Sequence, residues 1–147
     1  MIPVPQTRSM LEVLRIREQK RRLALARLAR HIARERSGIE AADTLIAAVK
    51  DRLHACLDAR FATGSRSVAA LAEVEAHAKN LRARAEELLG LRQKSEQALE
   101  ELLVEQRASA KLWRHSEAAL GHVQSIARRG LALREVRRAE LEEQEWR

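Results

Sequence analysis

Proline occurs only at the start of this chain, and this distribution limits the possible folds more than any other feature. Pro3 and Pro5 are the two prolines, and the 142 residues that follow contain none. Because proline is the strongest helix breaker, its absence permits very long helices. From Leu11, alternating steps of three and four residues reach 15 positions, and 11 of them are apolar. These positions are Leu11, Leu14, Glu18, Arg21, Leu25, Leu28, Ile32, Glu35, Ile39, Ala42, Ile46, Val49, Leu53, Cys56 and Arg60. This spacing predicts a coiled-coil seam.

A second seam follows in a different register. It is apolar at 12 of the 17 positions Leu71, Val74, Ala78, Leu81, Ala85, Leu88, Arg92, Ser95, Leu99, Leu102, Gln106, Ser109, Trp113, Ser116, Leu120, Val123 and Ala127. The two seams are separated by residues 63–67, a cluster of turn formers with Gly64 to end one helix and serines to cap the next. So short a link requires antiparallel helices. The sequence therefore predicts an all-α fold, a long two-helix antiparallel coiled-coil hairpin. We expect a single elongated domain over 1–147, with helix 1 at about 7–62, a turn at 63–67 and helix 2 at about 68–143.

A turn centred near residue 65 also predicts which positions face each other. Val49 should face Leu81, because facing residue numbers then add to about 130. Gly38 and Gly90 fall at one height in this register, which indicates a close approach or a bend, with coincidence as the alternative. The first helix runs out opposite residue 122, on the order of 25 residues before the chain ends. We expect residues 123–147 to lack a partner within the chain and to be able to bind one.

The net charge of +7 lies entirely in the first part of the chain. Residues 1–36 hold ten basic and three acidic side chains, and the remaining residues hold 18 of each. The polar run 17–22 crosses the seam, so the apolar stripe fails there. Three interpretations are open: a solvated helix face, docking on an acidic protein surface, and binding to nucleic acid or anionic lipid. Missing aromatic platforms and zinc-ligand spacings disfavour nucleic acid, and arginines around the whole circumference disfavour a membrane-lying helix.

Catalytic and metal-binding patterns are missing from the sequence. There is no glycine-rich phosphate loop, no His-Glu-x-x-His motif and no nucleophile elbow, so we expect no enzyme and no cofactor. His54 and His77 could approach each other across the hairpin, but no further ligand completes a metal site, and two half-exposed neighbours are the simpler interpretation. The lone Cys56 lies on the seam and is expected to be a buried, inert thiol. The longest apolar runs have five residues and the start lacks a secretory segment, so we expect a soluble, cytoplasmic chain.

The layout resembles the YscO/FliJ family of type III secretion and flagellar export stalk proteins. The resemblance rests on the opening Leu11-Glu-Val-Leu-Arg-Ile-Arg-Glu18, on the basic helix of Ala, Leu and Arg that follows, on the central turn, and on an end rich in Arg and then Glu. It implies a non-enzymatic antiparallel coiled coil that sits in the pore of a hexameric secretion ATPase and contacts the export gate and secretion chaperones. It also implies a cytoplasmic location, peripheral to the secretion apparatus at the inner membrane. The last quarter is less acidic than in the closest secretion-type members, so the flagellar or nonflagellar system stays open.

The resemblance gives the basic helix and the turn end expected partners. The expected ATPase-binding residues are Arg15, Arg17, Lys20, Arg21 and Arg22. The expected gate- or chaperone-binding residues are Phe61, Val68, Leu71, Val74 and Glu75. We expect no nucleic acid partner, no membrane insertion and a monomer when the chain is free. The alternative is a structural coiled-coil tether or dimerising scaffold, in which residues 123–147 pair with another chain.

Overall fold

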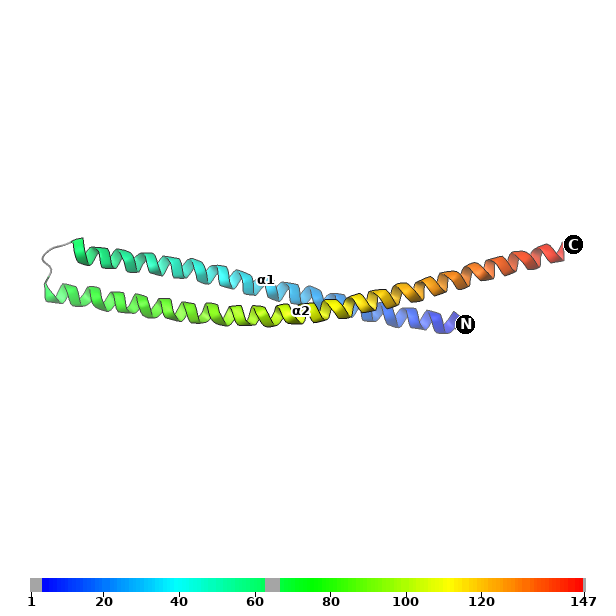
Figure 1. Cartoon of the computed structure of the whole chain (residues 1–147), viewed down its shortest axis with the longest axis horizontal. Helices are drawn as coiled ribbons and strands as arrows, with labels where there is room; N and C mark the ends of the chain where they lie inside the picture. The colour runs from blue at the N-terminus through cyan, green and yellow to red at the C-terminus, as the bar shows by residue number, and fades with distance from the viewer. Residues whose placement is uncertain (1–3, 63–66, 147) are drawn as a thin grey trace. The chain divides into compact units, whose positions relative to one another are not determined.

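Two long helices, α1 and α2, pack against each other (Figure 1). α1 spans Val4–Ala62 and α2 spans Val68–Glu145. The computed structural model describes residues 4–62 and 67–146, and it describes side chains over 6–59 and 67–146. The all-α helical hairpin predicted from the two seams is confirmed.

The helix ends lie close to the predicted bounds, and local chemistry explains the differences. α1 begins at Val4 rather than near residue 7, because Pro5 falls in the first turn, where a missing N–H costs no helical hydrogen bond. Ser67 caps α2: its Oγ accepts a hydrogen bond from the Ala70 backbone N–H at 3.3 Å, and its carbonyl accepts one from the Leu71 N–H at 3.1 Å. Residues 63–66 of the predicted turn lie outside the described residues.

Side-chain burial follows the two seams. On α1, the fourteen seam positions from Leu11 to Cys56 are all buried or half-buried, and every other side chain between residues 8 and 56 is exposed. On α2, all 17 predicted seam positions from Leu71 to Ala127 are buried or half-buried. The heptad spacing therefore identified the packed face of both helices, including the positions where the seam residue is polar.

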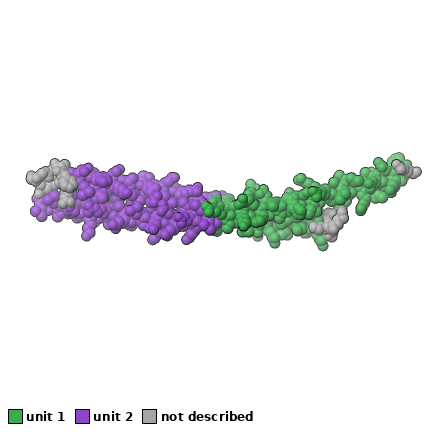
Figure 2. Space-filling view, viewed as in Figure 1, with its two compact units in different colours: residues 1–28, 105–147 green, residues 29–104 purple. Residues whose placement is uncertain are grey.

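The chain forms two compact units (Figure 2). Unit 1 contains residues 1–28 and 105–147, and unit 2 contains residues 29–104. Each unit therefore combines a part of α1 with a part of α2. The expectation of one domain over 1–147 stays a prediction.

Unit 2 holds the larger apolar core. Its buried centre consists of Ile46, Val49, Leu81 and Leu88, with Leu53, Cys56 and Ala85 packed against it. The predicted pair Val49 and Leu81 thus belongs to one cluster. Beside the core, the Arg92 Nε and an Asp43 carboxylate oxygen form an ion pair between the helices at 2.5 Å. Both partners are substantially exposed, so this pair adds little to the free energy of unfolding.

The two glycines of unit 2 do not mark a close approach. A Cβ atom built on Gly38 or Gly90 would meet nothing within 4 Å, and neither glycine has a positive φ. The sequence-based expectation of a close contact at this height is therefore wrong: both glycines lie on exposed helix surface, where the missing side chain leaves open space rather than room for the other helix.

Unit 1 has a thinner core that contains polar groups. Its buried side chains include the apolar Leu28 and Val123 and the polar Thr7 and Ser116. Over residues 4–62 and 67–146, neither helix offers a stretch that is apolar enough over sufficient length to cross a bilayer.

Candidate functional site

The basic arm is residues 8–28 of α1, which belong to unit 1 and hold seven basic and two acidic side chains, and most of its cations are exposed to solvent. The exposed cations are Arg8, Arg15, Arg17, Lys20, Arg22 and Arg27. Among the residues that the structure describes, none of these six has an ion-pair partner. Cations that form no ion pair within the chain remain available to attract an external anion.

Arg21 differs from the other cations of the basic arm because it faces α2. Its side chain is half-buried, and Nη1 donates a hydrogen bond to the Leu112 carbonyl oxygen at 2.8 Å and another to the Ser116 hydroxyl. Ser116 itself is only 4% exposed, so the guanidinium satisfies a hydroxyl that α2 buries. Of the five residues expected to bind an ATPase, four lie free on the surface and Arg21 holds the two helices together.

Glu18 is the second polar residue with which the arm crosses the seam. Its carboxylate accepts a hydrogen bond from Nε1 of Trp113 at 3.1 Å. Glu18, Arg21, Trp113 and Ser116 form a polar layer between α1 and α2. The apolar stripe fails here, as the sequence indicates, but hydrogen bonds between the helices replace it. Such a layer favours one helix register, because a shifted register would leave buried polar groups unpaired.

α1 also carries an exposed apolar stripe that was not predicted from the sequence. Met10, Val13, Ile16 and Leu23 are between 45% and 59% exposed, although Leu11 and Leu14 beside them enter the seam. The signal was present: from Val13, the stepping of three and four residues reaches Ile16 and then Leu23. This second line is shorter than the seam that starts at Leu11, and Lys20 interrupts it, so it does not stand out in the sequence.

The residues expected to bind a gate or chaperone do not form one surface. Val68 is 84% exposed and Glu75 is exposed, whereas Leu71 and Val74 are half-buried on the seam. The backbone of Phe61 is part of α1, but its side chain lies outside the described residues. The Val74 carbonyl accepts a contact from the Cys56 thiol at 3.6 Å, which places this carbonyl in the helix interface.

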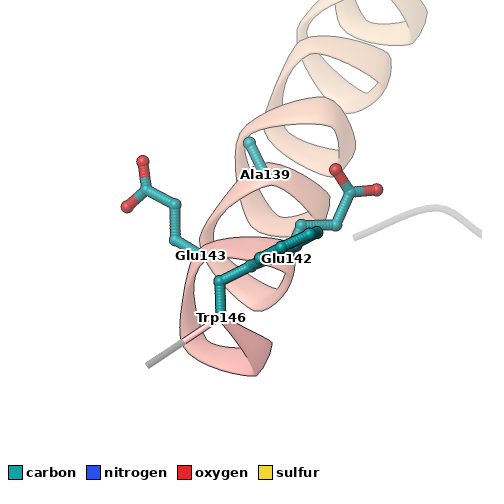
Figure 3. Close-up of a pocket in the computed structure, with 4 residues that line it drawn as sticks. All are labelled: Ala139, Glu142, Glu143 and Trp146. Atoms are coloured by element: carbon teal, nitrogen blue, oxygen red, sulfur yellow. The ribbon is translucent and has the colours of Figure 1, made fainter.

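The end of α2 offers a long uncovered surface. Every side chain from Leu131 to Trp146 is exposed, whereas Val123 is buried and Ala127 is half-buried. The unpartnered segment is therefore shorter than the predicted 123–147. Trp146 is 91% exposed and lines a shallow hollow with Ala139, Glu142 and Glu143 on the last turns of the helix (Figure 3).

The described residues contain no group of three His, Cys, Asp or Glu side chains that could hold a metal ion. His54 and His77, which the sequence placed at one height, are both exposed. Cys56 is half-buried and free. Among the described residues, the basic arm is therefore the strongest candidate for a functional site.

Comparisons with family models, with curated proteins and with solved structures find no match to this chain.

Proposed function

We propose that this protein is a non-enzymatic coiled-coil stalk component of a bacterial type III protein secretion apparatus. In this role it binds the hexameric secretion ATPase and links it to the export gate or to chaperones. It works in the cytoplasm, at the periphery of the apparatus. The observation that carries the proposal is the basic arm: free cations on a helix that a second helix holds in place.

The docking surface of the proposal consists of Arg15, Arg17, Lys20 and Arg22. Arginine suits an acidic protein surface, because its guanidinium can bind a carboxylate with two parallel hydrogen bonds. A helix packed on a partner helix also loses less conformational freedom on binding than a free helix does. Arg21 contributes indirectly, since its hydrogen bonds to α2 position the arm.

Charge reversal tests the docking surface. The variant Arg15→Glu/Arg22→Glu changes two exposed cations of the arm, and Arg107→Glu/Lys111→Glu changes two exposed cations of α2 in the same unit by the same total charge. Binding of each full-length variant to a purified hexameric secretion ATPase is measured by sedimentation, together with the rate of ATP hydrolysis. We expect the affinity of the arm variant for the ATPase to fall at least about tenfold and that of the control to stay unchanged. Equal losses for the two variants, or no loss, would reject the assigned surface.

The gate or chaperone contact is proposed for the start of α2. Val68 and Glu75 are exposed there, and an exposed valine beside a fixed helix cap gives a partner an ordered apolar contact. Val68→Asp should weaken binding of a gate protein or chaperone and leave ATPase binding unchanged. A chaperone that binds this variant as well as the wild type would remove Val68 from the site.

A structural tether is the second candidate function, and the end of α2 favours it. Residues 128–138 hold five arginines and one glutamate, whereas residues 139–145 hold four glutamates and no cation. Two copies of this segment placed antiparallel would bring the basic half of one against the acidic half of the other. Mass measurement in solution separates the candidates: the stalk is a monomer when free, and the tether is a dimer.

A further inference from the structure

The exposed apolar stripe of the basic arm has the spacing of a second seam. Val13, Ile16, Lys20, Leu23 and Arg27 follow one another in steps of three, four, three and four residues, all within unit 1. Side chains at this spacing form a straight line along a helix. The three apolar members are 49%, 52% and 59% exposed, so α2 does not cover them.

Cations lie on this apolar line and beside it. Lys20 and Arg27 lie on the line itself, and the exposed Arg17 lies on its flank, whereas Arg15 and Arg22 lie farther round the helix. Glu12 is the one exposed acidic side chain of α1 between residues 8 and 34. An apolar centre with a charged rim is the usual anatomy of a protein interface, in which a few anchors supply most of the binding free energy.

We propose that Val13, Ile16 and Leu23 bind the apolar face of an acidic amphipathic helix from another protein, as a third helix laid along α1. The line from Val13 to Leu23 covers ten residue steps, about 15 Å at 1.5 Å per residue, which matches about three turns of a partner helix. Leucines of the partner pack on the apolar line, and its glutamates or aspartates pair with Lys20, Arg27 and Arg17. This inference rests on the proposed docking of the basic arm to an acidic protein, but it does not require that protein to be an ATPase.

The chemistry of the line favours a protein helix over the other anionic partners. A nucleic acid backbone offers phosphates but no apolar face for Ile16 and Leu23, and no aromatic side chain is available there for base stacking. A helix that lies on a membrane normally inserts Trp or Phe, whereas this line has only aliphatic side chains and is interrupted by Lys20. A partner helix with separate apolar and acidic positions satisfies both kinds of side chain.

The test uses the full chain and two synthetic peptides. One is an 18-residue helical peptide with leucines at three- and four-residue spacing and glutamates elsewhere, and the other has the same charge with each leucine replaced by glutamine. Fluorescence anisotropy measures binding of labelled peptide. We expect the leucine peptide to bind at least about tenfold more tightly than the glutamine peptide. Equal binding of the two peptides would overturn the proposal, because charge alone would then explain the affinity, and so would failure of the leucine peptide to bind.

Variants of the chain locate the contact. Ile16→Gln/Leu23→Gln removes two apolar anchors without changing charge, and glutamine keeps a good helix propensity. The control Leu131→Gln/Leu133→Gln changes two leucines that are 58% and 60% exposed on α2. The affinity of the first variant for the leucine peptide should fall at least about tenfold, and the affinity of the control should not change. Equal behaviour of the two variants would overturn the assigned line, and circular dichroism checks that both remain helical.

Two further measurements separate this proposal from its competitors. Vesicles of phosphatidylglycerol should bind the wild type and Ile16→Gln/Leu23→Gln equally, through the unchanged cations; selective loss of vesicle binding by that variant would overturn the proposal in favour of a membrane. If the leucine peptide binds as expected and a secretion ATPase does not, the proposed function fails and the helix-binding line stands. If Ile16→Gln/Leu23→Gln still binds both the leucine peptide and the ATPase, the apolar line is not the contact, and docking through the arginines stands.

Discussion

Leu88 and Leu89 allow a direct test of the helix register in unit 2. They are adjacent leucines on α2, but Leu88 is 3% exposed in the apolar core and Leu89 is 47% exposed. Replacing either by alanine removes the same atoms and changes helix propensity by the same amount. The difference between the two variants therefore isolates burial between the helices.

The expected costs follow from the atoms withdrawn from packing. Leu→Ala removes roughly three carbon atoms, and at about 0.8 kcal/mol per buried methylene the Leu88 variant should lose about 2.4 kcal/mol of unfolding free energy. Leu→Ala at buried sites generally costs about 2–5 kcal/mol. The Leu88 value lies at the low end of this range, because only two helices form the core and solvent can enter the space that alanine leaves. Leu89 is 47% exposed, so only about half of the removed surface is buried and its variant should lose at most about 1.3 kcal/mol.

Urea unfolding followed by circular dichroism measures both free energies in the same full-length chain. The slope of free energy against urea should not change, since either variant keeps the same fold. A Leu89→Ala cost equal to that of Leu88→Ala would refute the register, and a larger one would indicate a shift by one residue.

Three further outcomes are expected. Gly38→Ala and Gly90→Ala should each raise the unfolding free energy by about 1 kcal/mol, because both glycines are helical with open space around a Cβ; a loss of stability in urea unfolding would mean that something contacts them. Trp113→Phe should cost about 1 kcal/mol by removing the N–H that binds Glu18, and the cost should fall when Glu18 is already alanine, so additive losses in this double-mutant cycle would contradict the hydrogen bond. In the Trp113→Phe chain, Trp146 is the one remaining indole and is 91% exposed, so its fluorescence should match that of indole in water; blue-shifted emission from the free chain would show that the end of α2 is covered.

The sequence predicted the fold well because coiled-coil packing is periodic. The stepping from Leu11 to Cys56 names the buried and half-buried side chains of α1 over residues 8–56, even at Glu18 and Arg21, where the residue type alone would suggest exposure. Helix geometry fixes which face a position occupies, so one chemical exception does not change the face. The helix bounds beside the turn formers were predicted correctly, whereas α1 begins at Val4 rather than near residue 7 and α2 ends at Glu145 rather than near residue 143.

The candidate site was predicted only in part. Charge counting located the basic arm, but it could not separate Arg21 from its neighbours Lys20 and Arg22, because all three carry the same charge. What separates them is the position of Ser116 and of the Leu112 carbonyl on the other helix. The two valines of the gate- or chaperone-binding set were divided in the same way, since Val68 lies off the seam and Val74 lies on it.

The sequence by itself determined that this chain forms two long helices, which face of each helix packs, and where the excess positive charge lies, because these properties depend on local spacing and composition. Only the tertiary structure decided which of those side chains remain free. Arg21 is held by α2, while Val13, Ile16 and Leu23 are left uncovered beside free arginines. The physical reason is that a side chain's availability depends on the atoms that the partner helix brings to it, and those atoms belong to residues about 90 positions away in the chain.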